Sequence, residues 1–161
     1  MTVFSRLGAM ALGLGAGVVA LDQASKHWVL TGLDLPARIS VPVVGPLYLT
    51  MVWNQGVSFG LFRADIEIVR WVLTAFSLGV ALMLGLWARK VDRPLMAVGL
   101  GLVMGGAIGN AIDRIRFGAV VDFLDVTRLM FPWVFNIADA GITIGVIFLL
   151  LDSNRKEATN G

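Results

Sequence analysis

The sequence contains no cysteine and only one histidine, His27, among its 161 residues. These absences exclude disulfides, a thiolate nucleophile and cysteine-based metal sites, and a lone histidine cannot build a multi-histidine metal centre. Charged residues are also scarce, because Asp, Glu, Lys and Arg together supply 15% of the chain whereas 57% is hydrophobic. A soluble domain of this length could hardly hide so many apolar side chains from water, so the composition predicts an integral membrane domain.

Four apolar stretches are long enough to cross a membrane, at about residues 7–28, 66–88, 94–112 and 132–151. Each is close to the roughly 20 residues that a spanning helix requires. The first stretch alone resembles a secretory signal peptide, but it leads into Asp22 and Lys26 rather than into a cleavage site. We therefore predict a single domain over residues 1–161 with four transmembrane helices.

Small residues recur at four-residue spacing in the predicted helices, most clearly as Gly101, Gly105 and Gly109 in the third helix. Glycine is common in membrane helices in general, but stripes of this kind also allow two helix backbones to approach closely. The pattern predicts a compact bundle.

The segment between the first two predicted helices, residues 31–65, has a different pattern. It carries Pro36 and Pro42, and its apolar residues alternate with others, as at Val41 and Val43. Alternation is typical of short strands, and proline marks the turns between them. The predicted fold class is thus a membrane all-α protein with a small β part, namely a four-transmembrane-helix bundle plus a small extramembrane β-sheet.

Basic residues indicate the orientation of the bundle. Four spans place both termini on one side, which holds six basic residues: Arg6, Arg89, Lys90, Arg93, Arg155 and Lys156. The opposite side holds seven: Lys26, Arg38, Arg63, Arg70, Arg114, Arg116 and Arg128. These totals do not decide which side is cytoplasmic. Three of the six basic residues on the side of the termini fall within the short hinge 89–93, and the positive-inside rule applies to short loops. Their density therefore favours cytoplasmic termini. The net charge of +2 reflects such loops, and nothing indicates a nucleic-acid partner.

Polar residues gather at the other end of the predicted bundle, although they come from distant parts of the chain. They are Asp22, Lys26, Asn54, Asn110, Asp113, Arg114, Asp122, Asn136 and Asp139. An ionisable side chain at membrane depth costs several kcal/mol and usually marks a functional site. Asp139 has about twelve helical residues beyond it, or roughly 18 Å, and should lie within the ~30 Å hydrocarbon layer.

Asp122 and Asp139 are the best candidates for chemistry in this cluster. Two carboxylates close together in a poorly solvated pocket cannot both ionise easily, so the pKa of one rises and the pair shares a proton. One can then act as base and the other as acid, which activates water against an amide without a metal, a cofactor or a covalent nucleophile. Asn110 precedes Asp113, and Asn136 precedes Asp139, by three residues, so each amide can orient its neighbouring carboxylate.

Other roles remain open for several of these residues. Asp22 and Lys26, spaced i and i+4, most simply form an ion pair that anchors a helix end. Asp113 and Arg114 would likewise pair with polar groups and hold the following loop. Ser25 and Lys26 resemble a serine/lysine dyad, but neighbours in a helix point about 100° apart.

Alternatives also exist for the pair and for the protein. Asp125 is the main competitor for the role of Asp122, or else an ordinary solvated loop acid. A small proton-coupled transporter or channel would also carry intramembrane acids, although it would distribute them through the membrane. A structural membrane subunit would tolerate asparagine at both positions.

Five sequence blocks occur in order along nearly the whole chain. They are Asp22-Gln-Ala-Ser-Lys26, Asn54-Gln-Gly56-Val-Ser-Phe59, Gly105-Gly-Ala-Ile-Gly109-Asn110-Ala-Ile-Asp113-Arg114, Val121-Asp122-Phe123 and Phe135-Asn136-Ile-Ala138-Asp139. Together they resemble the blocks of bacterial lipoprotein signal peptidase, or signal peptidase II, a family of membrane aspartic peptidases. Val57, Ser58 and Ala140 depart from the residues usual in that family.

The resemblance implies an aspartic endopeptidase of the bacterial cytoplasmic (inner) membrane, with both termini cytoplasmic and the active site near the outer leaflet. Its substrates would be diacylglyceryl-modified prolipoproteins, cleaved just before the lipidated cysteine, with membrane lipids as further partners and globomycin as an inhibitor. It would be a monomer without cofactors. Asp122 and Asp139 would be the catalytic dyad. Residues that line or support the site would be Asp22, Lys26, Asn54, Gly56, Asn110, Asp113, Arg114, Asn136 and Ala138.

Overall fold

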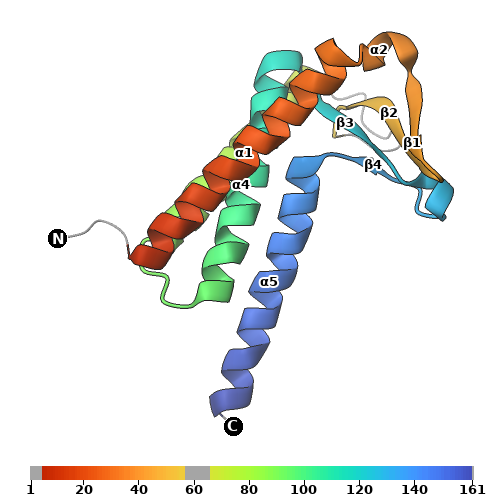
Figure 1. The fold of residues 1–161 in the computed structure, drawn as a ribbon. Coiled ribbons are helices and arrows are strands. Elements are labelled where there is room, and N and C mark those ends of the chain that lie inside the picture. The colour runs from red at the N-terminus through yellow and green to blue at the C-terminus, as the bar shows by residue number, and fades with distance from the viewer. Residues whose placement is uncertain (1–4, 57–65, 161) are drawn as a thin grey trace.

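The computed structural model describes residues 5–56 and 66–160 of the chain (Figure 1). Its long helices are α1 (Arg6–His27), α3 (Ile66–Ala88), α4 (Pro94–Phe117) and α5 (Ile137–Asn160), and α1 continues into a π-helical turn, η1 (Trp28–Gly32). In the described ranges, four helical segments are long and apolar enough to cross a membrane: Arg6–Gly32, Glu67–Ala88, Pro94–Phe117 and Ile137–Asn154. The predicted fold class is confirmed.

Two helices end or begin elsewhere than the hydropathy pattern suggested. α4 continues past about residue 112 to Phe117, and it ends at Gly118, whose φ of +79° suits glycine at a helix end. α5 begins at Ile137 rather than near residue 132, because Val134 and Phe135 pair with β3 as a short strand. An apolar run cannot by itself distinguish a strand from the first turn of a helix.

α4 lies at the centre of the bundle, packed against α1, α3 and α5. The glycine stripe explains this position, because a Cβ atom on Gly105 would lie 2.5 Å from the Gly15 carbonyl oxygen of α1. A Cβ atom on Gly106 would meet the Ala138 carbonyl oxygen of α5. Only glycine allows α4 to approach both neighbours this closely, so the prediction of a tightly packed stripe is confirmed.

A small antiparallel sheet lies at one end of the bundle (Figure 1). Its strands, in spatial order, are β1 (Ser40–Val44), β2 (Leu47–Asn54), β3 (Val120–Asp125) and β4 (Val134–Phe135). The predicted sheet was confined to residues 31–65, whereas β3 and β4 come from the chain after α4. Residues 57–65 of that predicted segment lie outside the described residues. The short helix α2 (Leu35–Arg38) and the 3-10 turn η2 (Thr127–Leu129) complete this end.

Strand β3 lies between β2 and β4 and is buried along most of its length. Val121 and Phe123 pack with Val29, Leu35 and Leu49 in a hydrophobic cluster beneath the sheet. This cluster ties the sheet to η1 and α2, so β3 has a defined position relative to the helices. The position of Asp122, which lies between Val121 and Phe123, follows from that packing.

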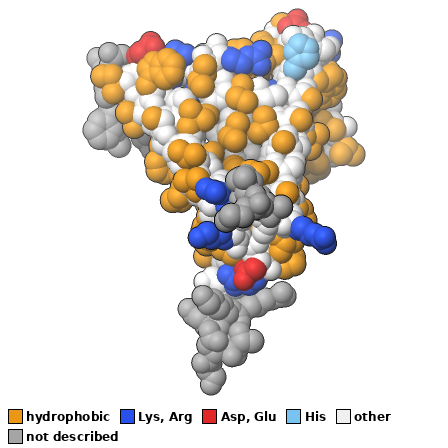
Figure 2. Space-filling view, turned by 90° about the vertical axis from the view of Figure 1, so that its left-hand side faces the viewer, with side chains coloured by type: hydrophobic (Ala, Val, Ile, Leu, Met, Phe, Trp, Pro, Cys, Tyr) orange, Lys and Arg blue, Asp and Glu red, His pale blue; other side chains and the backbone are white. Residues whose placement is uncertain are grey.

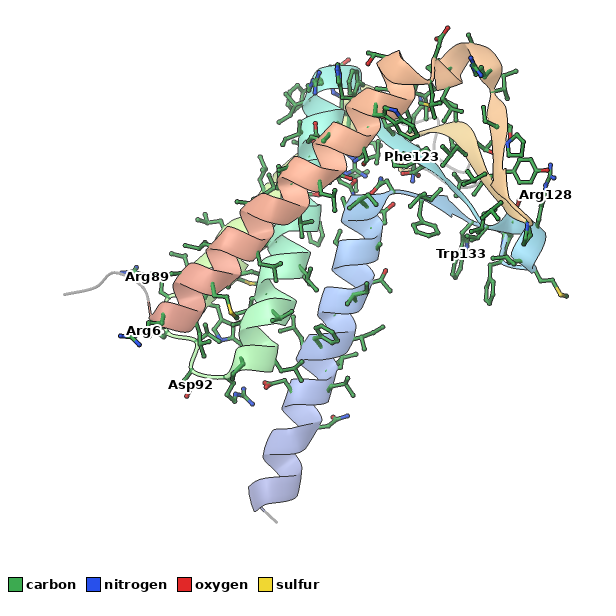
Figure 3. All side chains as sticks on the ribbon, viewed as in Figure 1. Arg6, Arg89, Asp92, Phe123, Arg128 and Trp133 are labelled. Atoms are coloured by element: carbon green, nitrogen blue, oxygen red, sulfur yellow. The ribbon has the colours of Figure 1, made fainter. Side chains whose placement is uncertain are left out.

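The outer surface has the pattern of a membrane protein. Figure 2 shows a broad band of hydrophobic side chains with charged side chains gathered at its two ends. Figure 3 places Arg6, Arg89 and Asp92 at the end away from the sheet, and Arg128 and Trp133 at the sheet. The apolar band and the four long helices together describe a multi-pass membrane protein.

Candidate active site

The two aspartates singled out by the sequence come from different elements and meet through one asparagine. Asp122 lies in β3, and Asp139 lies in the first turn of α5. The Asn136 amide nitrogen donates to Asp122 Oδ1 at 2.7 Å, and Asn136 Oδ1 accepts from the Asp139 backbone N–H at 2.9 Å. Asp139 Oδ2 accepts from the Asn136 backbone N–H at 3.4 Å, which completes a capping box. Asn136 and Asp139 are thus paired, but through backbone N–H groups, and the Asn136 amide nitrogen bonds the carboxylate of Asp122 rather than, as predicted, that of Asp139.

A second amide, from α4, closes the connection between the two carboxylates. Asn110 Nδ2 donates to Asp139 Oδ1 at 2.7 Å, and Asn110 Oδ1 accepts from Asn136 Nδ2 at 3.2 Å. Asp122 and Asp139 are thus joined through two amides that contact each other. The sequence paired Asn110 with Asp113, and this was wrong, because the Asn110 amide faces α5 across the close helix contact.

Asn54, at the end of β2, holds the other oxygen of Asp122. Because β2 pairs with β3, Asn54 Nδ2 reaches Asp122 Oδ2 and donates to it at 3.0 Å. The Gly56 backbone N–H donates to Asn54 Oδ1 at 2.8 Å, and the φ of Gly56 is +79°, which glycine adopts without strain. Val57 and Ser58 lie outside the described residues.

A pocket of about 420 Å³ opens beside Asp122, lined by Val52, Trp53, Asn54, Gln55, Asp122, Pro132, Trp133 and Val134. The Asp122 side chain is only 2% exposed. Burial raises the pKa of Asp122 to about 6; the hydrogen bond from Asn54 lowers it, and the negative charge of Asp139 raises it. A carboxyl group with this pKa holds a proton in an appreciable fraction of molecules near neutral pH, as a proton-sharing pair requires.

Asp125, the alternative to Asp122 as a catalytic residue, has both carboxylate oxygens engaged in hydrogen bonds that hold a turn. Side chains three residues apart on a strand point to opposite faces. Asp125 Oδ1 accepts from the backbone N–H and the hydroxyl of Thr127, at 2.9 and 2.6 Å, and Oδ2 accepts from the Thr50 hydroxyl at 2.6 Å. Burial acts to raise the pKa of Asp125, but the hydrogen bonds from Thr127 and Thr50 outweigh it and hold the pKa below its usual value. Asp125 is therefore a structural carboxylate.

Asp22, Lys26 and Asp113 form a buried ionic cluster behind the pair. Lys26 Nζ lies 2.8 Å from Asp22 Oδ2 and 2.7 Å from Asp113 Oδ2, and the three side chains are at most 2% exposed. The predicted ion pair of Asp22 with Lys26 is confirmed, and Asp113 joins it. Gln23, which sequence reasoning did not single out, donates to Asp113 Oδ1 at 2.9 Å. The sequence argued against a serine/lysine dyad, and the structure agrees, because the Ser25 hydroxyl donates to the Asp22 carbonyl oxygen while Lys26 binds the two aspartates.

The last two predicted site residues lie beside this cluster. Arg114 Nη1 donates weakly to the Asn110 carbonyl oxygen at 3.5 Å, and its guanidinium is within electrostatic reach of Asp139 and Asp122. Ala138 is fully buried, and its backbone N–H donates to Asp22 Oδ1 at 2.9 Å. All the supporting residues identified from sequence are thus at the sheet end of the bundle.

The chain is similar in sequence to known proteins over most of its length. Residues 14–155 match the family described as signal peptidase (SPase) II. A lipoprotein signal peptidase of Caulobacter vibrioides is 55% identical to the chain, over 95% of this chain and 91% of the relative. A lipoprotein signal peptidase of Methylorubrum extorquens is 46% identical, over 96% of this chain and 89% of the relative.

Two solved structures of bacterial membrane enzymes, both determined by the in meso method, share the fold. The first, at 2.3 Å resolution, has a TM-score of 0.78 and 27% identity, over 95% of this chain and 92% of its own. The second, at 1.9 Å resolution, has a TM-score of 0.76 and 28% identity, over 89% of this chain and 92% of its own. Since both the family match and the relatives extend over most of the sequence, the chain belongs to the signal peptidase II family of aspartic peptidases, which process lipoproteins.

Proposed function

We propose that the protein removes signal peptides from diacylglyceryl-modified prolipoproteins by water activation at the Asp122/Asp139 pair. The observation that carries this proposal is the pair itself, two carboxylates joined through Asn136 and Asn110, one of which, Asp122, lines an open pocket. The names of the relatives supply the substrate class. Cleavage just before the lipidated cysteine is the expectation carried over from the family resemblance.

The proposed reaction uses the pair as base and acid in turn. The ionised carboxylate accepts a proton from water as the water oxygen attacks the scissile carbonyl carbon. The protonated partner then gives its proton to the amide nitrogen as the carbon–nitrogen bond breaks, which leaves a new carboxyl group and a free amine on the cysteine. The raised pKa of Asp122 supports this division, because one proton must stay on the pair before attack.

The surroundings of the pair support a role in peptide binding. Trp53 and Trp133 line the pocket beside Asp122, and tryptophan is typical of the membrane interface. Asn54, held by Gly56, would orient Asp122 toward this pocket. The remaining supporting residues would hold the pair from the opposite side: Asp22, Lys26, Asn110, Asp113, Arg114, Asn136 and Ala138.

We place the protein in the bacterial inner membrane with both termini in the cytoplasm. The concentration of basic residues in the hinge between α3 and α4, at the end away from the sheet, supports this orientation. The pair would then lie near the outer leaflet, where a lipidated precursor presents its cysteine. The protein would act there as a monomer among membrane lipids.

The proton-coupled transporter is a weaker alternative. In the described part of the bundle, the space between the two ends is filled by apolar side chains such as Ala11, Leu100, Met104 and Ala107. A proton relay needs titratable groups through that depth. The family match also favours the peptidase.

A cleavage assay tests the proposal. Purified protein is incubated with a diacylglyceryl-modified prolipoprotein, and the product is followed by its mobility on a gel and by its new N-terminal residue. We expect wild type and Asp125→Asn to release the signal peptide, globomycin to block release, and Asp122→Asn and Asp139→Asn to be inactive although folded. Cleavage by Asp139→Asn at the wild-type rate would refute the dyad, and proton flux in liposomes without cleavage would favour the transporter.

A further inference from the structure

The ammonium group of Lys26 has all its hydrogen-bonding capacity in use. Its three N–H donors face three acceptors, Asp22 Oδ2 at 2.8 Å, Asp113 Oδ2 at 2.7 Å and Asn110 Oδ1 at 3.4 Å. The side chain is 2% exposed. A lysine that is buried and fully engaged in this way is poorly placed to exchange protons with a substrate.

The two carboxylates bound to Lys26 each hold the main chain next to one member of the proposed dyad. Asp22 Oδ1 accepts from the backbone N–H of Ala138, the residue immediately before Asp139, at 2.9 Å. Asp113 Oδ2 accepts from the backbone N–H of Val121, the residue immediately before Asp122, at 3.0 Å. Each member of the proposed dyad thus follows a residue whose backbone N–H is bound by a carboxylate, and Lys26 connects the two carboxylates.

We propose that Lys26 is a positioning residue that sets the separation of the two catalytic carboxylates by tying Asp22 and Asp113 together. The link runs from the start of α5 through Asp22, Lys26 and Asp113 to β3. This inference rests on the proposed function of the Asp122/Asp139 pair. It assigns to Lys26 a role in geometry rather than in proton transfer.

The cost of burying these charges supports a positional role. Moving ions from water into a protein interior carries a desolvation penalty of several kcal/mol each, and apolar residues of similar size are often at least as stabilising. Hydrogen bonds to main-chain N–H groups are directional, which hydrophobic contacts are not. Because a displacement of about 1 Å in a catalytic group can cost on the order of 100-fold in rate, a rigid link between the carboxylates has a direct catalytic value.

The bonds through Lys26 add to other contacts between α5 and β3. Asn136 and Asn110 fix how the Asp122 and Asp139 side chains are turned, since they bond to the carboxylate oxygens. Asn136 Nδ2 also donates to the Val121 carbonyl oxygen at 3.3 Å, and β4, which ends just before α5, pairs with β3. The bonds that Ala138 and Val121 donate to Asp22 and Asp113 tie both backbones to α1 and α4 as well.

The same chain offers a matched control at the other end of the bundle. Arg93 Nη1 lies 2.7 Å from Asp152 Oδ2, and the Asp152 side chain is 8% exposed. This pair links the start of α4 to α5 and is remote from the sheet. Asp152→Asn therefore breaks an ion pair whose aspartate is buried and whose arginine is 38% exposed, without touching the proposed site.

The test measures kcat and KM for Asp22→Asn, Asp113→Asn and the double variant, per folded molecule and well below each melting temperature. Asparagine keeps an oxygen acceptor for the Ala138 or Val121 N–H but loses the ionic bond to Lys26. We expect each single variant to lose roughly 10- to 100-fold in kcat with KM within about twofold. Lys26→Met leaves two buried carboxylates without a counter-ion and reduces folding, so the two asparagine variants carry the test.

The double variant distinguishes a connected link from two separate supports. If both carboxylates act through Lys26, breaking one end already releases the link, and the double variant should be within about twofold of the worse single variant. If the fold-losses in kcat of the two single variants multiply in the double variant, the inference is overturned, because Asp22 and Asp113 then contribute independently. Wild-type kcat in both single variants, with only a lower melting temperature as in Asp152→Asn, would also overturn it.

The same series of variants distinguishes a failure of the Lys26 inference from a failure of the proposed function. Asp122→Asn and Asp139→Asn are measured in the same series. Activity in those two variants refutes the dyad, whereas their inactivity together with normal kcat in Asp22→Asn and Asp113→Asn refutes only the role of Lys26.

Discussion

The two ends of the bundle each contain an ion pair with a buried aspartate but use it differently. At the end away from the sheet, Arg93 and Asp152 form one ion pair between α4 and α5. At the sheet end, the ionic cluster of Lys26 continues through main-chain bonds and amides into β3, α4 and α5, and it stands behind a pocket. A salt bridge with a buried aspartate therefore occurs at both ends, and what distinguishes the sheet end is the connection of its cluster to the proposed catalytic pair.

The largest expected effect separates two aspartates on the same helix. Asp139→Asn should lower kcat by more than about 1,000-fold, because one member of the acid–base pair can no longer ionise. Asp152→Asn, at the other end of α5, should leave kcat within about twofold of wild type. Both are measured by prolipoprotein cleavage with purified, folded protein, and a comparable loss in the two variants would remove the functional difference between the ends.

A second pair of variants compares the residues that cap two helices. Asn136→Ala removes the cap of α5 and its bond to Asp122, so we expect kcat to fall by on the order of 100-fold. Ser5 caps α1 at the opposite end, where its hydroxyl oxygen accepts from the Gly8 N–H. Ser5→Ala should cost about 1 kcal/mol of stability and leave kcat unchanged. Equal losses of kcat in Asn136→Ala and Ser5→Ala would contradict a catalytic role specific to the Asn136 cap.

Two glycines test whether close packing matters most near the site. A Cβ atom on Gly109 would lie 2.7 Å from Asp22 Oδ2, so Gly109→Ala should displace that carboxylate and lower kcat roughly tenfold. Gly13, on the outer face of α1, has nothing within 4 Å of its Cβ position. Gly13→Ala should be neutral or slightly stabilising, since alanine favours helix. Thermal unfolding and cleavage rates measure both, and a Gly109→Ala protein with full activity would argue against a tightly positioned Asp22.

The last comparison concerns pH and stability rather than catalysis. The pKa of Asp122 is raised from 3.8 to about 6 by burial, so between these values the folded protein binds more protons than the unfolded chain. Stability should therefore fall as pH rises through this window, by about 3 kcal/mol at most, and Asp122→Asn should lack this decline. Melting temperatures of both proteins at pH 4.5 and pH 7.5 give the comparison. Parallel pH dependence in the two proteins would contradict the raised pKa.

Much of the fold follows from local sequence. The four apolar stretches predict the helices, and the glycine stripe on α4 predicts close contact. The sheet was only half predicted, because the pairing of β2 with β3 joins residues on either side of two helices, and no local pattern encodes such a pairing. For the same reason the run from residue 132 was assigned to a helix, although Val134 and Phe135 pair with β3.

The site was also predicted in part. The gathering of Asp22, Asn110, Asp122, Asn136 and Asp139 at one end follows from four helices of alternating direction, and it is confirmed. The partner of Asn110 was not predictable, because an amide on a helix face can bond along its own helix or across to a neighbour. The role of Asp122 and Asp139 as catalytic residues stays a prediction until cleavage is measured.

By itself the sequence determined the membrane environment, the number of spanning helices and the set of polar residues that share one end, because hydropathy and helix period are local properties. Only the tertiary structure decided which amide bonds which carboxylate, that Asp125 closes a turn while Asp122 lines a pocket, and that Lys26 joins both sides of the pair. Those outcomes depend on how closely α1, α4, α5 and β3 approach one another. That distance is set by packing between residues far apart in the chain.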